Sequence, residues 1–329
     1  MRRFLLGVLI AIVCVAAGSA LYAYREVRVD RSLPVGETTV LVPKGALASQ
    51  TARQLAREGV IASPFLFDLL VRAEHAGDRI RAGQFRFAAH QSLEEIVREL
   101  ITGGRQVAVW VTIPEGFTAR ETAATLAAHN LGSQAVFDRL FLHGSISLYG
   151  VRTSSLEGFL FPSTYLVPIG ASPEAVARQF IDQFLAELPP DAGRRAKLLG
   201  LTVPQVVTLA SLIEREAKAD DERRLMAGVY YNRLRRGMPL EVDATIEYIF
   251  PKHKDVITLA DLARDSPYNT YKHIGLPPTP IAAPGRASLR AAFNPQASDY
   301  LFYVYKGNGH HAFSRTLAEH QAAAARYLR

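Results

Sequence analysis

The sequence predicts an α+β protein in which an N-terminal transmembrane helix precedes a small α+β module and a larger α+β domain. Its 329 residues amount to about two ordinary domains. A long uncharged apolar run stands at the N-terminus. Behind it, segments with the two-residue alternation of strands are interspersed with segments that have the apolar spacing of helices.

The composition excludes several classes of protein. Apolar side chains make up 49% of the chain and charged ones 21%, which are proportions of a globular protein and not of a disordered or collagen-like one. A single cysteine excludes an internal disulfide framework and a cysteine-rich zinc site. The excess of 38 Lys and Arg over 31 Asp and Glu, a net charge of +7, favours an anionic partner such as nucleic acid, a phospholipid surface or an acidic polymer.

The N-terminal run indicates a membrane anchor. Residues Phe4–Ala23 carry no charge, and about 20 such residues span the hydrocarbon core of a bilayer. Arg2 and Arg3 precede the run, and the positive-inside rule keeps that end in the cytoplasm, although three arginines also follow within a few residues. We therefore expect a cytoplasmic tail at residues 1–3 and a transmembrane helix at 4–24.

A cleaved signal peptide is the alternative interpretation of this run. Gly18, Ser19 and Ala20 supply the small residues of a cleavage site, but the run is longer than the apolar region of a typical signal peptide. Both interpretations export the rest of the chain. Cys14 lies within the run, so the exported part has no thiol, which suits an oxidising compartment and disfavours nucleic acid as a partner.

The predicted small module covers residues 37–106. Ser92, with Glu95 three residues later, forms the capping-box pattern that begins a helix. The module reads strand, helix, helix, strand, helix, over Glu37–Val42, Leu47–Glu58, Pro64–Glu74, Phe85–Ala88 and Leu93–Ile101.

The predicted larger domain covers residues 107–329, with its core at about 190–329. Thr202 and Pro204 are typical of a helix N-terminus, and that helix ends at Glu216. Residues 243–281 are rich in loop-forming residues. The other expected elements are strands over Val107–Ile113, Tyr300–Tyr305 and His310–Ser314, and helices over Arg120–His129, Pro173–Leu188, Glu222–Gly237 and Leu317–Leu328.

Two glutamates at the end of one helix are candidates for acid–base chemistry. At about 100° per residue, Glu214 and Glu216 flank the apolar stripe of this helix on opposite sides. A carboxyl group beside apolar neighbours has a raised pKa, which a general acid needs near neutral pH. Periodicity does not choose between the two residues. The alternative is that both are boundary residues in salt bridges with Arg215 or Lys218.

The loop-rich region supplies residues typical of a sugar-binding surface. Tyr268 to Tyr271 combine tyrosine rings with an amide and a hydroxyl on a proline-rich segment, and such rings pack against carbohydrate faces. The pair His310–His311 and nearby Ser314 are residue types found in zinc sites and serine triads, but the chain has neither an HExxH nor a GxSxG pattern. We therefore expect no metal and no cofactor.

Taken together, these segments resemble the YceG-like family of endolytic murein transglycosylases. The resemblance covers nearly the whole exported chain and is densest between Leu209 and His320. Leu209–Glu216 is similar to the family's signature around its catalytic glutamate, which falls on Glu216. Further matching segments are Glu222–Arg223, Asn232–Leu234, Gly237–Met238, Asp243–Thr245, Tyr268–Tyr271, Gly275–Pro278, Pro280–Ile281, Pro284–Gly285, His311, Phe313–Ser314, Thr316 and Glu319–His320.

The resemblance also implies a domain plan and a set of substrate-binding candidates. Ala82–Phe85 and the helix after it resemble the family's LysM-like module, and Leu156–Pro162 resembles the entry to its catalytic domain, whose helical core is expected to be partly lysozyme-like. The candidates for substrate binding are Ser211, Glu222, Asn232, Asp243, Thr245, Tyr268, Asn269, Thr270 and Tyr271.

The function implied is that of a peptidoglycan lytic transglycosylase. Such an enzyme cuts glycan strands internally between N-acetylmuramic acid and N-acetylglucosamine and leaves a 1,6-anhydro end, which would terminate or trim nascent strands. One carboxyl suffices because the C6 hydroxyl of the sugar is the nucleophile, whereas glycoside hydrolases generally use two. The expected location is the bacterial cytoplasmic (inner) membrane, crossed once, with the catalytic domain periplasmic or extracytoplasmic. The expected partners are peptidoglycan, the membrane and penicillin-binding proteins, and not nucleic acid.

Two alternatives remain open from the sequence. The chain could be a muramidase that uses water, with Glu216 as acid and Asp243 or Glu222 as base. It could also be a non-catalytic murein-binding scaffold of the cell-wall synthesis machinery.

Overall fold

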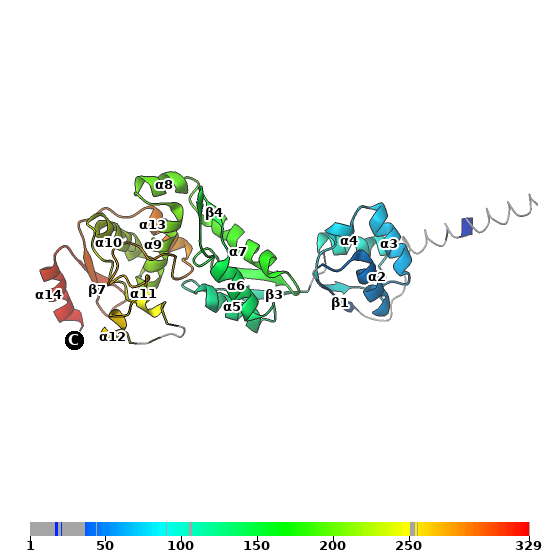
Figure 1. The fold of residues 1–329 in the computed structure, drawn as a ribbon, viewed down its shortest axis with the longest axis horizontal. Coiled ribbons are helices and arrows are strands. Elements are labelled where there is room, and N and C mark those ends of the chain that lie inside the picture. The colour runs from blue at the N-terminus through cyan, green and yellow to red at the C-terminus, as the bar shows by residue number, and fades with distance from the viewer. Residues whose placement is uncertain are drawn as a thin grey trace, which may run out of the picture. The chain divides into compact units, whose positions relative to one another are not determined.

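The protein is described here by a computed structural model (Figure 1), which covers residues 17–18, 21, 37–43, 45–89, 91–104, 107–250, 254 and 256–328. Apart from residues 17–18 and 21, the expected transmembrane span at 4–24 lies outside these described residues. The chain forms two compact units, Met1–Trp110 with Leu166–Ser172, and Val111–Tyr165 with Pro173–Arg329.

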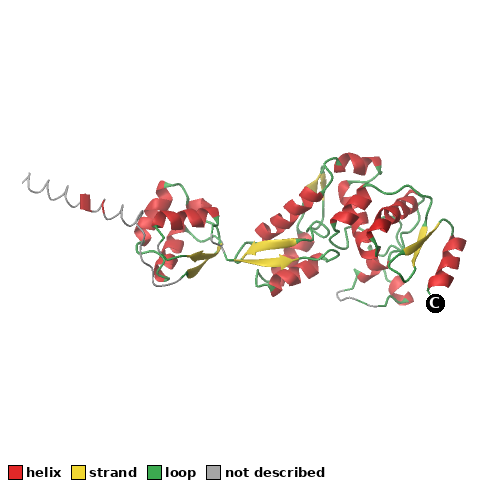
Figure 2. Cartoon of the chain, turned by 180° about the vertical axis from the view of Figure 1, so that it is seen from behind, coloured by secondary structure: helices red, strands yellow, loops and turns green. Residues whose placement is uncertain are grey.

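The expected α+β class is confirmed. Small two-stranded sheets stand among many helices (Figure 2). The sheets pair β1 (Thr38–Val42) with β2 (Gly83–Phe87), β3 (Ala108–Thr112) with β6 (Thr164–Pro168), β4 (Ser147–Leu148) with β5 (Val151–Arg152), and β7 (Phe302–Tyr305) with β8 (His311–Ser314).

The first unit is built on the antiparallel pair β1–β2, in which Thr38 lies opposite Phe87 and Val42 opposite Gly83. Alternate residues of both strands point into one apolar core, as the two-residue period requires. Helices close this core, and the expected capping box of Ser92 and Glu95 is present at the start of α4. The helices are α2 (Ala48–Arg57), α3 (Pro64–Ala73), the short 3-10 helix η1 (Gly77–Arg79) and α4 (Leu93–Thr102).

The second unit is centred on the buried helix α9 (Val203–Glu216), which packs against α8, α10, α11 and α13 (Figure 1). Thr202 caps α9 together with Gln205, with proline in the first turn, as expected. The other helices of this unit are α5 (Ala119–Ala128), α6 (Gln134–His143), α7 (Pro173–Glu187), α8 (Ala192–Leu198), η2 (Asp220–Glu222), α10 (Arg223–Arg235), α11 (Asp243–Glu247), α12 (Leu259–Leu262), α13 (Arg286–Phe293) and α14 (Leu317–Tyr327).

The region expected to be rich in loops, residues 243–281, also contains two short helices, α11 and α12. Helices of four or five residues are too short to display a 3.6-residue apolar period, so the sequence pattern does not reveal them. Helices α6, α8 and α13 and the pair β4–β5 also have no counterpart among the expected elements.

No single helix within the described residues is long and apolar enough to cross a membrane. Only α8 and α9 together reach that length and composition, and they are bent by 81° at the break between them. The apolar residues of α9 are buried in the core of the second unit.

Candidate active site

Glu216 is the last residue of α9, and side chains from other elements surround its carboxylate. The Tyr303 hydroxyl on β7 donates a hydrogen bond to Glu216 Oε2 at 3.1 Å. The hydroxyls of Tyr303 and the buried Tyr230 of α10 lie 2.9 Å apart. The backbone N–H of Ala244 on α11 lies near enough to lower the pKa of the Glu216 carboxyl. The carboxylate of Glu216 therefore lies between the end of α9, the strand β7 and the short helix α11.

The surroundings of Glu216 change its acidity. Burial raises its pKa to about 7, because the charged form loses hydration, and the negative charge of Asp243 acts in the same direction. The hydrogen bonds from Tyr303 and Ala244 and the positive charge of Lys218 lower the pKa and partly offset this rise. Glu216 as a residue is partly exposed. Its carboxyl therefore has the acidity that a general acid needs near neutral pH.

A second carboxylate stands beside Glu216. Asp243 is the first residue of α11 and is exposed, and its Oδ1 accepts a hydrogen bond from the Tyr271 hydroxyl at 2.5 Å. The negative charges of Asp243 and Glu216 both raise the pKa of Tyr271, after burial, the largest cause. The structure thus brings Glu216, Asp243 and Tyr271 together from three separate segments of the chain.

Glu214 has different surroundings from Glu216. Its side chain is only 6% exposed. Its Oε1 accepts a hydrogen bond from the Arg223 guanidinium at 3.2 Å, and its Oε2 accepts one from the Gly285 backbone N–H at 2.8 Å. Both oxygens of Glu214 are used to join α9 to α10 and to the start of α13. The Glu214 carboxylate is therefore used in structural contacts, whereas burial raises the pKa of Glu216.

Glu222 is buried and holds the hairpin β7–β8. Its Oε1 accepts a hydrogen bond from the His311 backbone N–H at 2.8 Å, and its Oε2 lies 2.9 Å from His311 Nδ1. The His311 ring meets the Tyr303 ring edge-on, with centroids 5.5 Å apart. Glu222 therefore acts on the site through the hairpin that carries Tyr303.

Two other substrate-binding candidates, Ser211 and Asn232, form hydrogen bonds within the helical core. Ser211 is fully buried, donates to the Thr208 carbonyl and accepts from the Ile281 N–H. Asn232 donates to the carbonyls of Ser298 and Tyr300, both at 2.8 Å. These contacts position the loops around α9 and α10.

Three candidates form one buried network under α11. The hydroxyls of Thr245 and Thr270 lie 3.0 Å apart, and Thr270 also accepts from the Val242 N–H. Asn269 donates to two carbonyls and accepts from the Tyr271 N–H. Because Tyr271 in turn binds Asp243, this network fixes the carboxylate that stands beside Glu216.

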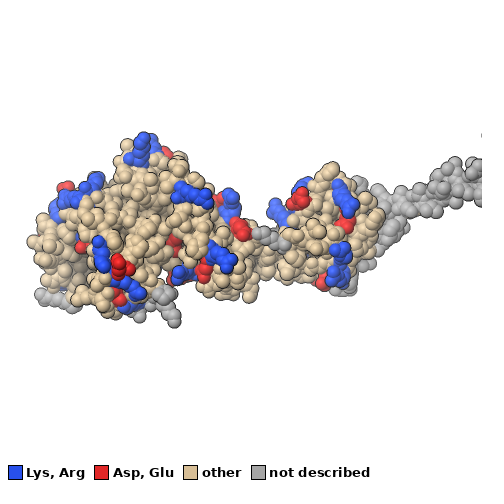
Figure 3. Space-filling view, viewed as in Figure 1, with Lys and Arg blue, Asp and Glu red and all other residues tan. Residues whose placement is uncertain are grey.

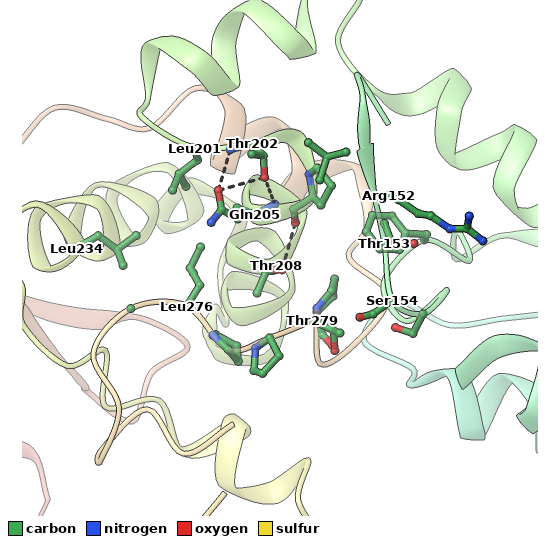
Figure 4. A pocket seen from close by; sticks show the side chains of 18 residues that line it. Arg152, Thr153, Ser154, Leu201, Thr202, Gln205, Thr208, Leu234, Leu276 and Thr279 are labelled. Atoms are coloured by element: carbon green, nitrogen blue, oxygen red, sulfur yellow. Dashed lines mark hydrogen bonds between the residues drawn. The ribbon is translucent and has the colours of Figure 1, made fainter. Parts of the chain in front are cut away.

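Tyr268 borders another part of the unit. Its hydroxyl lies 2.8 Å from that of Thr279, which lines a cavity of about 600 Å³ between the proline-rich segment 275–280, residues 151–155 and the start of α9. Figure 4 shows Thr202, Gln205 and Thr208 of α9 lining this cavity. Thr202 and Glu216 stand at opposite ends of α9, about 20 Å apart at the rise of an α-helix, so the cavity belongs to the other end of that helix.

Tyr303 and Tyr230 were not among the residues singled out in the sequence. Tyr303 lies on the expected strand at 300–305, and its alternation indicates only that it faces one side of the hairpin. Its contact with Glu216 joins residues 87 apart in sequence. No local spacing signals such a pairing.

A second buried carboxyl lies in the same unit. Glu157 is 1% exposed, and it accepts hydrogen bonds from the Ala119 N–H at 2.9 Å and from the Tyr248 hydroxyl at 3.1 Å. Burial raises its pKa to about 7. Ala119 begins α5 and Tyr248 follows α11, so Glu157 links these two helices.

The site contains no evident ligand set for a metal. Within the described parts of the chain, no group of three or more His, Cys, Asp or Glu side chains is arranged to hold a metal ion.

Basic and acidic side chains are interspersed on the face seen in Figure 3.

Comparisons with known proteins give one consistent result. A family model described as "YceG-like family" matches residues 40–326. An endolytic murein transglycosylase of Bacillus subtilis is 33% identical over 305 residues, which cover 87% of this chain and 84% of that protein. One of Streptococcus pneumoniae is 29% identical over 366 residues, covering 97% of this chain and 65% of the longer relative. A yceG-like protein of Listeria monocytogenes, known from a crystal structure, is similar with a TM-score of 0.59 and 28% identity, covering 87% of this chain and 98% of that one.

Proposed function

Because this chain belongs to the YceG-like family, we propose that it is a peptidoglycan lytic transglycosylase that cuts murein glycan strands internally. The relatives in Bacillus subtilis and Streptococcus pneumoniae bear the name endolytic murein transglycosylase. The observation that carries the proposal is Glu216, a carboxyl at the end of a buried helix whose pKa burial raises to about 7. The names of these relatives favour an enzyme over a non-catalytic scaffold.

The mechanism that we propose uses one carboxyl twice. Protonated Glu216 gives its proton to the oxygen that links N-acetylmuramic acid to N-acetylglucosamine, and the bond from C1 to that oxygen breaks. The C6 hydroxyl of the muramic sugar then forms a bond to C1, and the Glu216 carboxylate takes the hydroxyl proton. The products are a 1,6-anhydro end and a free 4-hydroxyl, and no water is consumed.

Tyr303 and Asp243 adjust the two roles of Glu216 in this mechanism. The Tyr303 hydroxyl stabilises the carboxylate that forms after the first proton transfer, while the negative charge of Asp243 favours the return of a proton. The residues Ser211, Asn232, Thr245, Asn269 and Thr270 are buried and hold the walls of the site through the contacts described above.

The experiment that tests the proposal is release of muropeptides from purified murein by wild type and Glu216→Gln. Gln keeps the shape of the side chain but cannot deliver the proton, so we expect the rate to fall by about 10²- to 10⁴-fold. Glu214→Gln is the matched control, because it changes the neighbouring glutamate that binds Arg223 and Gly285. It should lower thermal stability while the folded molecules still turn over. Activity retained by Glu216→Gln contradicts the assignment, and so does an inactive but well-folded Glu214→Gln.

A muramidase is the second candidate function. For a muramidase, the position of Asp243 favours Asp243 over Glu222 as the base that activates water. Asp243 is exposed and close enough to raise the pKa of Glu216, so it has the access that a base activating water needs. Both oxygens of Glu222 are occupied by His311.

We further propose that residues 4–24 form a transmembrane helix behind a short cytoplasmic tail at 1–3, with the catalytic domain outside the cytoplasmic membrane. The uncharged apolar run and the arginines before it support this topology. Protease added to spheroplasts should degrade the catalytic domain of the intact chain. Protection in intact spheroplasts and cleavage only after lysis would contradict this topology.

The domain plan and partners are proposals of the same kind. We propose that residues 37–106 form a LysM-like murein-binding module, that 107–329 form the catalytic domain, and that the region at about 190–329 has a partly lysozyme-like core. The burial of α9, with a glutamate at its end, supports the last point. An enzyme that trims nascent strands would work beside penicillin-binding proteins, the partners that we propose.

A further inference from the structure

A cavity of about 210 Å³ in the second unit is lined by sequence neighbours of Glu216 and Asp243. The start of α5, the end of α9, α11 and residues 248–250 line it. Two lining residues connect it to the candidate active site. Arg215 directly precedes Glu216, and Ala244 directly follows Asp243. The cavity therefore adjoins the end of α9 that carries Glu216 and the start of α11 that carries Asp243.

The walls of this cavity are fixed by buried contacts. Glu157 lines it and is held from two sides by α5 and by the Tyr248 hydroxyl. The next residue, Gly158, has a φ of +80°, and a Cβ at this position would overlap Pro280. Tyr248, Phe250 and the buried Ile281 add apolar surface. The cavity is therefore a built feature of the unit.

The charges around the cavity are of both signs. Arg215 is already paired with Glu247 at 2.8 Å. Arg120 is exposed and lines the cavity, and among the described residues it forms no ion pair. Glu121 and Glu157 also line it. Both oxygens of Glu157 are already bound, and Glu121 caps α5 with Thr118. Arg120 is thus the charged side chain that is available to an incoming carboxylate.

Peptidoglycan carries such a group close to the bond that is cut. Its stem peptide is attached through the lactyl ether at C3 of the muramic sugar, two carbons from C1, and it bears carboxylates and an amino group. We propose, on the basis of the proposed function, that this cavity is the subsite for the stem peptide and that Arg120 binds one of the peptide's carboxylates. The enzyme would then favour strands that still carry their peptides.

The test compares two substrates and three forms of the full-length protein. The substrates are peptide-bearing glycan strands and the same strands stripped of peptides by an amidase. The forms are wild type, Arg120→Ala and, as matched control, Arg194→Ala, which removes an exposed arginine of α8 paired with Asp191. The readout is the ratio of kcat/KM for the two substrates.

We expect wild type and Arg194→Ala to share a ratio well above one, and Arg120→Ala to lower that ratio by about tenfold, because a hydrogen bond to a charged group is lost. Equal cleavage of both substrates by wild type, or an unchanged ratio in Arg120→Ala, overturns the subsite and leaves the transglycosylase function standing. If wild type cleaves neither substrate, the proposed function fails and the subsite fails with it.

Discussion

Glu214 and Glu216 are two residues apart on one helix, and their partners give them different roles. Both oxygens of Glu214 are bound, by Arg223 and by the Gly285 N–H. Burial and the charge of Asp243 raise the pKa of Glu216 to about 7. The helical period places both residues beside the apolar stripe, but the partner of each comes from another element. The sequence pattern therefore cannot choose between them.

The pH dependence of kcat/KM should report the acidity of Glu216. The protonated form is active, so we expect kcat/KM to fall about tenfold per pH unit above a pKa of about 7. Tyr303→Phe removes a hydrogen bond to the carboxylate, which raises the pKa of Glu216 and moves this falling limb of the pH profile to higher pH. Asp243→Asn removes a negative charge, which lowers the pKa and moves the limb to lower pH.

The opposite directions of these two shifts make the pH experiment specific. Each limb position comes from initial rates on murein measured between about pH 5 and pH 9. General damage to the site would lower the rates of both variants without moving the limbs apart. Limbs that coincide in wild type and both variants would contradict the role of Glu216 as the titrating acid.

At the scale of elements, the hairpin β7–β8 is as important as α9. It carries Tyr303 to Glu216, and the buried contact between Glu222 and His311 holds it in place. The expected strands at 300–305 and 310–314 are close to the observed hairpin, because the turn residues Gly307 to Gly309 mark it. The sequence indicates that a hairpin exists there. It does not indicate which helix the hairpin packs against, because that depends on tertiary contacts.

Loss of the Glu222 carboxylate should therefore destabilise the protein. Glu222→Ala leaves the buried His311 N–H groups without their acceptor, and we expect the free energy of unfolding to fall by about 2–4 kcal/mol. Asp221→Ala is the control, because its side chain is 75% exposed beside His310 and exposed pairs contribute about 1 kcal/mol or less. Chemical denaturation measures both. A Glu222→Ala protein of wild-type stability that fails to bind murein would instead indicate direct substrate binding.

The short helix α11 shows what sequence patterns miss at this scale. Its five residues, Asp243–Glu247, bring Asp243 to Tyr271 and Glu247 to Arg215. The segment has too few residues to display a helical period. The contact between Thr245 of this helix and the buried Thr270 holds it in place.

At the scale of the whole molecule, all the residues placed around Glu216 belong to the second unit. The α+β class follows from the mixture of two-residue and helical periods, and family membership follows from many matching segments in order. The site geometry does not follow from the sequence in the same way, because Glu216, Tyr230, Asp243 and Tyr303 come from four different elements.

The activity of the whole protein should not depend on a metal ion. The proposed reaction needs only the proton of Glu216. We expect the initial rate on murein to be the same before and after dialysis against EDTA. A loss of activity that zinc or magnesium restores would contradict a mechanism carried by carboxyl chemistry alone.

The mass of the muropeptides released from purified murein tests the central claim most directly. With wild-type protein, we predict products that end in 1,6-anhydro-N-acetylmuramic acid, and with Glu216→Gln we predict none above background. Products one water heavier, with a reducing end, would show hydrolysis in place of transglycosylation. Anhydro products from Glu216→Gln at the wild-type rate would contradict the assignment of Glu216 itself.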